Sequence, residues 1–276
     1  MVNPVGIERL CVFGMPPVEF VGLAASLDCR FIGVGLTAMR YYNPHGYPDW
    51  SLRDDPALRR EMGAALRDSG VSISLCEGFG VGRDFDPRDH AADLDIVHEL
   101  GARRINVVSV DKDFGRSADG FATFAALAAE RDMEAVVEIG PGAIRDLDAA
   151  VAAARHVGSP NFRLLVDTMH FFRFGGQVAE LAQIDPGLIG YVQLCDAPLR
   201  STFPTYMEEA LHERLSPGDG ELPLPDLLKL VPENVVVSVE VPQRSLAEAG
   251  IGPRERVGGV VAATRALLAR AVSASA

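Results

Sequence analysis

Strand-like segments alternate with helical segments along the whole 276-residue chain. The strand-like segments are short, apolar and rich in β-branched residues, and the segments between them have the pattern of helices. We expect strands at Arg9–Phe13, Phe31–Leu36, Val71–Cys76, Arg104–Ser109, Ala135–Ile139, Arg163–Asp167, Gly190–Leu194 and Val235–Glu240. The expected helices are Pro17–Leu27, Asp55–Asp68, Asp89–Leu100, Ala118–Glu130, Ala143–His156, Val178–Ala182, Pro225–Leu230 and Pro253–Ala271. This alternation predicts an α/β protein, a single (β/α)8 TIM barrel over residues 1–276 without a second domain.

The rival architecture is a doubly wound open sheet. Such a sheet would be expected to carry the glycine pattern G-x-G-x-x-G after its first strand, where it binds a phosphate. The corresponding turn here reads Phe13-Gly14-Met15-Pro16-Pro17, which lacks that pattern. Gly33 and Gly35 alternate within an expected strand, so we interpret them as tightly packed positions of a barrel core.

Composition narrows the class of partner. The net charge is −12, which argues against nucleic acid, because proteins that grip phosphate backbones usually present a basic face. No apolar run approaches the roughly 18 residues needed to span a membrane. The four cysteines form no C-x-x-C pair, and the first residues lack the pattern of a signal peptide. We therefore expect a cytoplasmic protein with a small-molecule partner.

Four consecutive expected strands end on an oxygen-bearing side chain. These residues are Glu138, Asp167, Gln193 and Glu240. Parallel strands joined by crossover helices place their C-terminal ends on one face of the sheet, so the four side chains should converge. An all-oxygen set favours Mn²⁺ or Mg²⁺, with Co²⁺ or Zn²⁺ as less favoured ions. The sequence thus predicts one divalent metal ion at the mouth of the barrel.

The same strand ends carry a family resemblance. The motifs are Val137-Glu138-Ile139, Asp167-Thr168-Met169-His170, Gln193-Leu194-Cys195-Asp196, Pro217-Gly218-Asp219-Gly220-Glu221 and Ser238-Val239-Glu240-Val241-Pro242. Through them the chain resembles the xylose isomerase-like TIM-barrel superfamily, the sugar phosphate isomerase/epimerase group. The resemblance implies that the four strand-end residues bind the metal and that His170 lines the substrate pocket. Many isomerases and epimerases of the family have His where this chain has Gln193, whereas bacterial 3-dehydroshikimate dehydratases are similar in having Gln.

Further residues are candidates for catalysis or substrate binding. Glu138, Glu240 and His170 are the expected acid–base groups, and the imidazole suits proton transfer near neutral pH. The expected substrate contacts are Arg173, Asp196, Arg214, Arg244 and Glu77. For Arg173 the alternative is a stacked surface residue, and for Asp196 it is a residue that orients a metal ligand. The aromatic loop over residues 41–50 is either a lid or substrate wall, or a loop tethered by its own aromatics.

These features predict a metal-dependent sugar or sugar phosphate isomerase/epimerase. The metal would polarise a carbonyl, a base would remove a neighbouring proton, and the metal would stabilise the enediolate. The first alternative is a lyase, 3-dehydroshikimate dehydratase, which would use the same metal site on a hydroxy-keto acid. The second is a barrel that binds a metabolite without turnover. A homodimer is compatible with a barrel of this kind, although no segment marks an interface.

Overall fold

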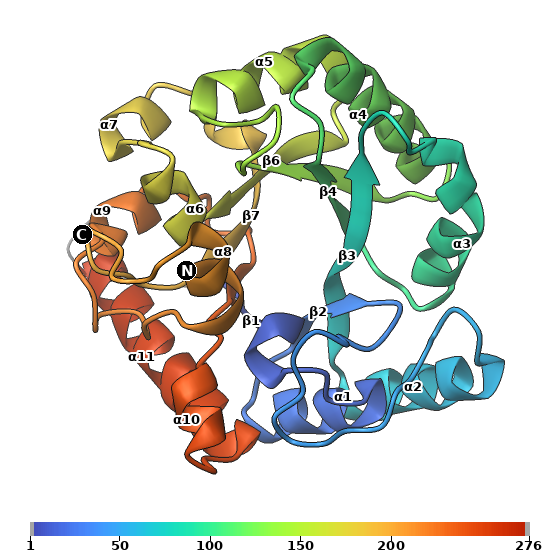
Figure 1. The fold of residues 1–276 in the computed structure, drawn as a ribbon, viewed down its shortest axis with the longest axis vertical. Helices are drawn as coiled ribbons and strands as arrows, with labels where there is room; N and C mark the ends of the chain where they lie inside the picture. Colours follow the sequence, from blue (N-terminus) through green and yellow to red (C-terminus); the bar gives the residue numbers. More distant parts are fainter. Residues whose placement is uncertain (1–2, 274–276) are drawn as a thin grey trace.

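Parallel strands close into an eight-membered barrel in the computed structural model, which describes residues 3–273 (Figure 1). The strands are β1 (Val5–Glu8), β2 (Phe31–Gly35), β3 (Ser72–Val81), β4 (Arg104–Ser109), β5 (Glu134–Glu138), β6 (Phe162–Asp167), β7 (Ile189–Leu194) and β8 (Val237–Val239). Each strand pairs with the next along the chain, and β8 pairs with β1. The predicted (β/α)8 TIM-barrel class is confirmed.

Helices surround the strands on the outside of the ring in Figure 1. The α-helices are α1 (Pro17–Ser26), α2 (Pro56–Ser69), α3 (Ala91–Glu99), α4 (Phe114–Ala129), α5 (Leu147–Val157), α6 (Thr168–Arg173), α7 (Val178–Leu181), α8 (Tyr206–His212), α9 (Leu224–Leu228), α10 (Arg244–Glu248) and α11 (Pro253–Ser273). Short 3-10 helices are η1 (Arg9–Val12), η2 (Pro87–His90) and η3 (Pro186–Leu188). Within the described part of the chain, no helix has the length and apolarity that crossing a membrane would require.

Local sequence explains where the helices begin and end, as α2 illustrates. The Asp55 side chain accepts hydrogen bonds from the backbone N–H groups of Ala57 and Leu58 at 2.9 and 3.0 Å, and Pro56 occupies the first helical position. Gly70 ends the helix with a φ of 70°, a left-handed conformation that glycine adopts without a steric cost. The chain then enters β3 two residues later.

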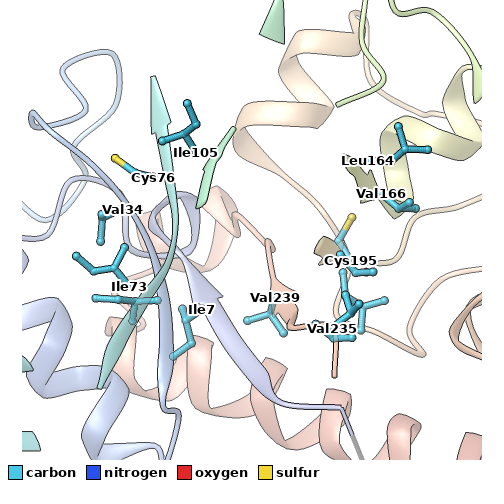
Figure 2. Close-up of a cluster of buried hydrophobic side chains, with 14 of the residues drawn as sticks. Ile7, Val34, Ile73, Cys76, Ile105, Leu164, Val166, Cys195, Val235 and Val239 are labelled. Carbon is cyan, nitrogen blue, oxygen red and sulfur yellow. The ribbon is translucent and has the colours of Figure 1, made fainter. Parts of the chain in front are cut away.

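Side-chain alternation along the strands divides the core into two layers. Val137 and Val166 belong to a large cluster between the strands and the helices, part of which Figure 2 shows. Val136, Leu165 and Tyr191 belong to a small second cluster. Because successive strand side chains point to opposite faces, that second cluster lies inside the barrel, on the face shared by the polar strand ends. The barrel is therefore filled with apolar residues below a polar mouth.

The prediction of a strand over Arg9–Phe13 is wrong. The first strand is Val5–Glu8, and Arg9–Val12 forms a 3-10 helix that ends at Phe13, whose φ is 46°. The apolar residues are buried as expected, but they pack beside α11, whose Arg256 donates to the Cys11 carbonyl at 3.2 Å. Burial alone does not distinguish a strand from a turn under a helix. The shift places Glu8 at the end of β1 and Arg9 just beyond it.

Three short helices, α6, α8 and α10, were not predicted, and β3 extends to Val81. Each of these helices has only five to seven residues, too few to establish a periodic pattern. All three follow the C-terminal ends of β6, β7 and β8, so they surround the mouth.

Candidate metal centre at the barrel mouth

The predicted strand-end residues do meet at one end of the barrel. Glu138, Asp167 and Gln193 lie in the last two positions of β5, β6 and β7, and Glu240 directly follows β8. A cavity of about 420 Å³ opens above them and is lined by Glu138, Gln193 and Glu240. Asp167 does not line this cavity, and its side chain is fully buried. The mouth therefore combines a cavity with a floor of polar side chains.

An arginine lies between two of the carboxylates. The Arg214 Nη1 atom is 2.6 Å from Asp167 Oδ2 and 3.0 Å from Glu240 Oε2. Its Nε donates to the Ala210 carbonyl at 2.9 Å, which fixes the direction of the side chain. Burial by itself would raise the pKa of Asp167, but the Arg214 charge, together with His170 and the hydrogen bonds that Asp167 accepts, outweighs burial and holds that pKa at about 2. Asp167 is thus a carboxylate at any ordinary pH.

Glu138 and His170 form a second contact. The His170 Nε2 atom is 3.2 Å from Glu138 Oε1, and Asn106 donates to Glu138 Oε2 at 2.8 Å. Burial raises the pKa of Glu138 to about 8 and lowers the pKa of His170 to about 4. The contact is therefore a hydrogen bond between neutral groups near pH 7, not an ion pair. On the other side of the imidazole, the hydroxyl of Tyr206 on α8 lies 2.8 Å from His170 Nδ1.

The carboxamide of Gln193 bridges the remaining acids. Its Nε2 donates to Glu77 Oε1 at 3.0 Å and to Glu240 Oε1 at 3.3 Å. Glu77 lines the cavity from β3, and burial raises the pKa of both glutamates. Below them Glu8 accepts a hydrogen bond from the Tyr191 hydroxyl at 2.7 Å, while its other oxygen, Oε2, is buried without a partner.

The donor set fits a divalent cation. Glu138, Asp167 and His170 each offer a ligand atom within 4.8 Å of the others, and Glu8, Glu77 and Glu240 form a second such group. Carboxylate oxygens with one imidazole nitrogen suit Mg²⁺ or Mn²⁺ and also admit Zn²⁺. Burial raises the pKa of both Glu138 and Glu240, so a bound cation would compete with protons for them.

The five expected substrate contacts separate into two groups. Arg214 and Glu77 line the cavity, whereas Arg173, Asp196 and Arg244 do not. Arg173 forms a bidentate pair with the buried Glu209, at 2.6 and 2.9 Å, and donates to the Pro198 and Leu199 carbonyls.

Asp196 and Arg244 likewise have partners within the protein. Asp196 accepts from the backbone N–H groups of Ala197, Gly218 and Leu222 at 2.8 to 3.1 Å, so it fixes the loop after β7. Arg244 pairs with Glu208 on α8 at 3.0 Å. The structure gives these two residues a role in holding loops around the mouth.

The loop after β2 combines the two alternatives considered for it. Tyr41 lines the cavity, while Trp50 donates from its indole nitrogen to the Gly14 carbonyl at 3.0 Å. Tyr42 stacks edge-on against Phe13, with ring centroids 4.9 Å apart. The loop is thus tethered and also supplies one wall of the cavity.

Four residues at the mouth were missed by the sequence analysis: Glu8, Arg9, Asn106 and Tyr206. Glu8 and Arg9 were hidden by the wrong position of the first strand. Asn106 had a detectable signal, because it is a polar residue within an otherwise apolar strand. Tyr206 had none, because it reaches His170 only through the path of the loop between β7 and α8.

A family model described as xylose isomerase-like TIM barrel matches residues 21–266. The chain belongs to that family. No curated protein matches its sequence. The family assignment agrees with the barrel and with the position of the polar cluster at the C-terminal ends of the strands.

Solved structures of similar fold cover nearly the whole chain. The IolI protein with a bound zinc atom superposes with a TM-score of 0.78 at 16% identity, covering 97% of this chain and 98% of that one. D-psicose 3-epimerase in the presence of D-fructose gives 0.72 at 14% identity, with 96% and 99% covered. An AP endonuclease of family 2 from Brucella melitensis gives 0.66 at 19% identity, with 91% and 97% covered. At such identities these similarities establish the shared fold.

Proposed function

We propose that this xylose isomerase-like barrel is a divalent-metal-dependent isomerase or epimerase that moves a proton next to the carbonyl of a small sugar-like or hydroxy-keto substrate. The observation that carries the proposal is the convergence of Glu138, His170 and Glu240 on one cavity above the Asp167–Arg214 pair. Structures of similar fold include D-psicose 3-epimerase, which agrees with this reaction class. Residues 1–276 would act as one catalytic domain.

The metal would be held by Glu138, Asp167, Gln193 and Glu240, with Mn²⁺ or Mg²⁺ preferred and Zn²⁺ or Co²⁺ as alternatives. A bound cation would polarise the substrate carbonyl and lower the cost of removing a neighbouring proton. Gln193 directs its amide nitrogen at Glu77 and Glu240, so binding a cation through its oxygen requires the carboxamide to turn over. Asp167 is ionised before any cation arrives.

Glu138 and Glu240 would act as the acid–base pair. Glu138 ends β5 and Glu240 directly follows β8, and these strands are three positions apart in the ring, so the two glutamates reach a bound substrate from different sides. A glutamate on one side can remove a proton while a glutamate on the other returns one. Return to the opposite face of the same carbon gives an epimer, and return to the neighbouring carbon gives an isomer.

His170 would serve as the proton relay of Glu138. Its imidazole is neutral near pH 7 because burial lowers its pKa to about 4. The Tyr206 hydroxyl at Nδ1 and the Glu138 carboxyl at Nε2 give it a partner on each ring nitrogen. Arg214 would stabilise negative charge that develops on the substrate oxygen, since it lines the same cavity.

Dehydration is the second candidate reaction. Gln193 is the residue that favours it, because the sequence resembles 3-dehydroshikimate dehydratases in having Gln at this position. Loss of a hydroxyl β to the carbonyl would follow the same proton abstraction, with a neighbouring acid protonating the leaving oxygen. The same residues serve both reactions, so the substrate decides between them.

Deuterium exchange tests the proposal. Metal-stripped protein, with Mn²⁺ or Mg²⁺ restored, would be incubated in D₂O with a panel of ketoses, keto acids and 3-dehydroshikimate and followed by NMR. We expect metal-dependent uptake of deuterium next to a carbonyl, lost in Glu138→Gln and Glu240→Gln. Asp226→Asn is the control, because Asp226 is an exposed acid paired with Lys229 away from the mouth.

The possible outcomes separate the reactions. Exchange into a ketose or keto acid supports the isomerase or epimerase, and aromatic product from 3-dehydroshikimate assigns the dehydratase. Tight metal binding without exchange into any compound favours a barrel that binds a metabolite without turnover. Failure of the protein to bind a divalent ion would contradict the proposal.

A further inference from the structure

Arg9 is a cation that faces the cavity without a partner. It follows β1 directly and lines the cavity, yet its guanidinium forms no hydrogen bond or ion pair with any residue that the structure describes. Arg214, the other arginine of the cavity, is held by Asp167 and Glu240. The free guanidinium is therefore the group best able to bind an anion that enters the mouth.

The backbone of β2 leaves room for Arg9. A Cβ atom at Gly35 would lie 1.6 Å from Arg9 Nη1, so the guanidinium rests on the bare backbone of that glycine. A side chain at residue 35 would displace the guanidinium. The position of Arg9 is thus set by a contact as well as by its place in the chain.

The walls of the cavity are apolar. Among the described residues, the large hydrophobic side chains that remain exposed are Tyr41, Phe85, Val110, Leu199, Met207 and Leu246. The first three line the cavity around the polar floor. Exposed apolar side chains that gather at one site indicate a ligand with apolar surface.

A second cavity of about 200 Å³ extends the first past Glu138 and His170. Met207 lines it, together with residues such as Ile139 and Ile144. Its two neutral hydroxyl side chains already have protein partners: Ser109 bonds to the Asp111 carbonyl and Tyr206 to His170. A substrate hydroxyl buried there would find no free side-chain partner, which would weaken its binding.

We propose that the substrate of this site is a carboxylic acid with a largely apolar body, whose carboxylate is bound by Arg9 and whose reactive carbonyl lies at Glu138, His170 and Glu240. The inference rests on the proposed function and narrows its substrate from polyhydroxylated sugars to keto or hydroxy acids. A monoanion is favoured over a phosphate because Arg9 is a single charge beside Glu77, whose carboxyl it influences electrostatically. Arg9 directly follows β1 and Glu138 ends β5, on opposite sides of the ring, so the acid would extend across the mouth.

Binding of an inert probe tests this substrate class. Benzoylformate carries a carboxylate, a ketone and a phenyl ring but no hydrogen next to the ketone, so proton abstraction cannot consume it. Its methyl ester and D-fructose are the neutral comparisons. Affinities would be measured by calorimetry on the full chain, once with Mn²⁺ and once in EDTA, so that chelation of the metal by the probe is recognised. We expect benzoylformate to bind more tightly than either comparison in both conditions.

Two variants and one control locate the carboxylate. Arg9→Gln should weaken benzoylformate about tenfold or more and leave the methyl ester unchanged, because only the charge-assisted contact is lost. Gly35→Ala should act in the same direction by displacing the guanidinium. Arg40→Gln should change nothing, since Arg40 is an exposed arginine paired with Asp49 outside the cavity. Retained ester binding shows that each variant is folded.

Specific results would overturn the inference. One is that D-fructose binds more tightly than benzoylformate. The other is that Arg9→Gln weakens the binding of benzoylformate and of its methyl ester equally, or weakens the binding of neither. Failure of the inference and failure of the proposed function are distinguishable. Metal-dependent exchange into neutral ketoses without Arg9-dependent binding would retain the function and reject the substrate class. Arg9-dependent binding of benzoylformate without deuterium exchange into any compound would retain the substrate class and reject the proposed function.

Discussion

Arg214 shows how single residues make the crowded mouth stable. Its side chain is 1% exposed and touches two acids, Asp167 and Glu240, that would otherwise be buried without a positive partner. A buried ion pair contributes little net stability over an apolar pair, but removal of one partner leaves an uncompensated charge. Asp167 is ionised in the native protein, where its pKa is about 2, and Arg214 is the largest of the contributions that lower this pKa.

We therefore expect Arg214→Gln to lower the free energy of unfolding by roughly 3–5 kcal/mol in EDTA, as measured by urea denaturation. Arg40→Gln, which breaks an exposed pair, should cost less than about 1 kcal/mol. Added Mn²⁺ should restore part of the loss in Arg214→Gln, because a cation would replace the missing charge. Equal stability of the two variants would contradict the role given to Arg214.

Glu8 predicts a pH dependence of stability. Burial, with the nearby Glu77 adding to it, raises the pKa of Glu8 from 4.5 to about 8. The folded protein thus holds a proton that the unfolded chain releases above its own pKa. The stability that this proton contributes is complete below about pH 4.5 and is lost as pH rises through about 8.

Glu8→Gln keeps a neutral side chain at every pH and removes this dependence. Relative to the native protein, the variant should gain stability between pH 5 and 8, on the order of a few kcal/mol. Denaturation at several pH values in EDTA checks this, with Asp226→Asn as the exposed control. A difference that stays constant with pH would show that Glu8 is ionised in the fold.

At the scale of elements, α8 and the residues that follow it bring Tyr206 and Arg214 to the mouth from outside the barrel. The helix begins with Tyr206, and Arg214 follows two residues after its end. The helix is fixed through Glu209, which is 1% exposed and paired with Arg173 on α6. A second pair, Glu208 with Arg244, lies closer to the surface.

Breaking the buried pair should therefore disturb α8 more than breaking the outer one. Arg173→Met should cost roughly 3 kcal/mol of stability and reduce activity by moving Tyr206, because it leaves Glu209 buried and unpaired. The double variant with Glu209→Met should recover much of the loss. Arg244→Met should cost less than about 1 kcal/mol. Equal costs for Arg173→Met and Arg244→Met in denaturation would refute this ranking.

Element by element, the sequence predicted β5 to β8 well and β1 poorly. In the later strands a polar residue ends an apolar run, so Asp167 marked both the strand and the site. The segment Val5–Glu8 contains a glycine, and the segment Leu10–Phe13 after it is more apolar. For this reason the strand was predicted at the second segment and not at the first. The pair Arg214–Asp167 spans 47 residues and depends on a loop path that no local pattern encodes.

For the whole molecule, the fold concentrates acidic groups at one end of the barrel. The net charge is −12, and five acids, Glu8, Glu77, Glu138, Asp167 and Glu240, gather around the mouth within the described chain. Burial raises the pKa of four of them, whereas Arg214 helps to keep Asp167 charged. The rigid barrel holds these groups together at a cost in stability that a bound cation would offset.

A divalent cation should therefore stabilise the folded protein. At a Mn²⁺ concentration 100 times its dissociation constant, ligand linkage gives about 2.7 kcal/mol, and for a chain of this size each kcal/mol raises the midpoint of thermal unfolding by roughly 2–4 °C. The increase should be much smaller in Asp167→Asn and Glu138→Gln and unchanged in Asp226→Asn, as followed by circular dichroism after EDTA treatment. The gain should also grow between pH 5 and 8, because protons leave Glu138, whose pKa is about 8, more readily as pH rises. An increase equal in all four proteins would mean that the ion binds elsewhere on the acidic surface, and the mouth would lose its assignment as the metal centre.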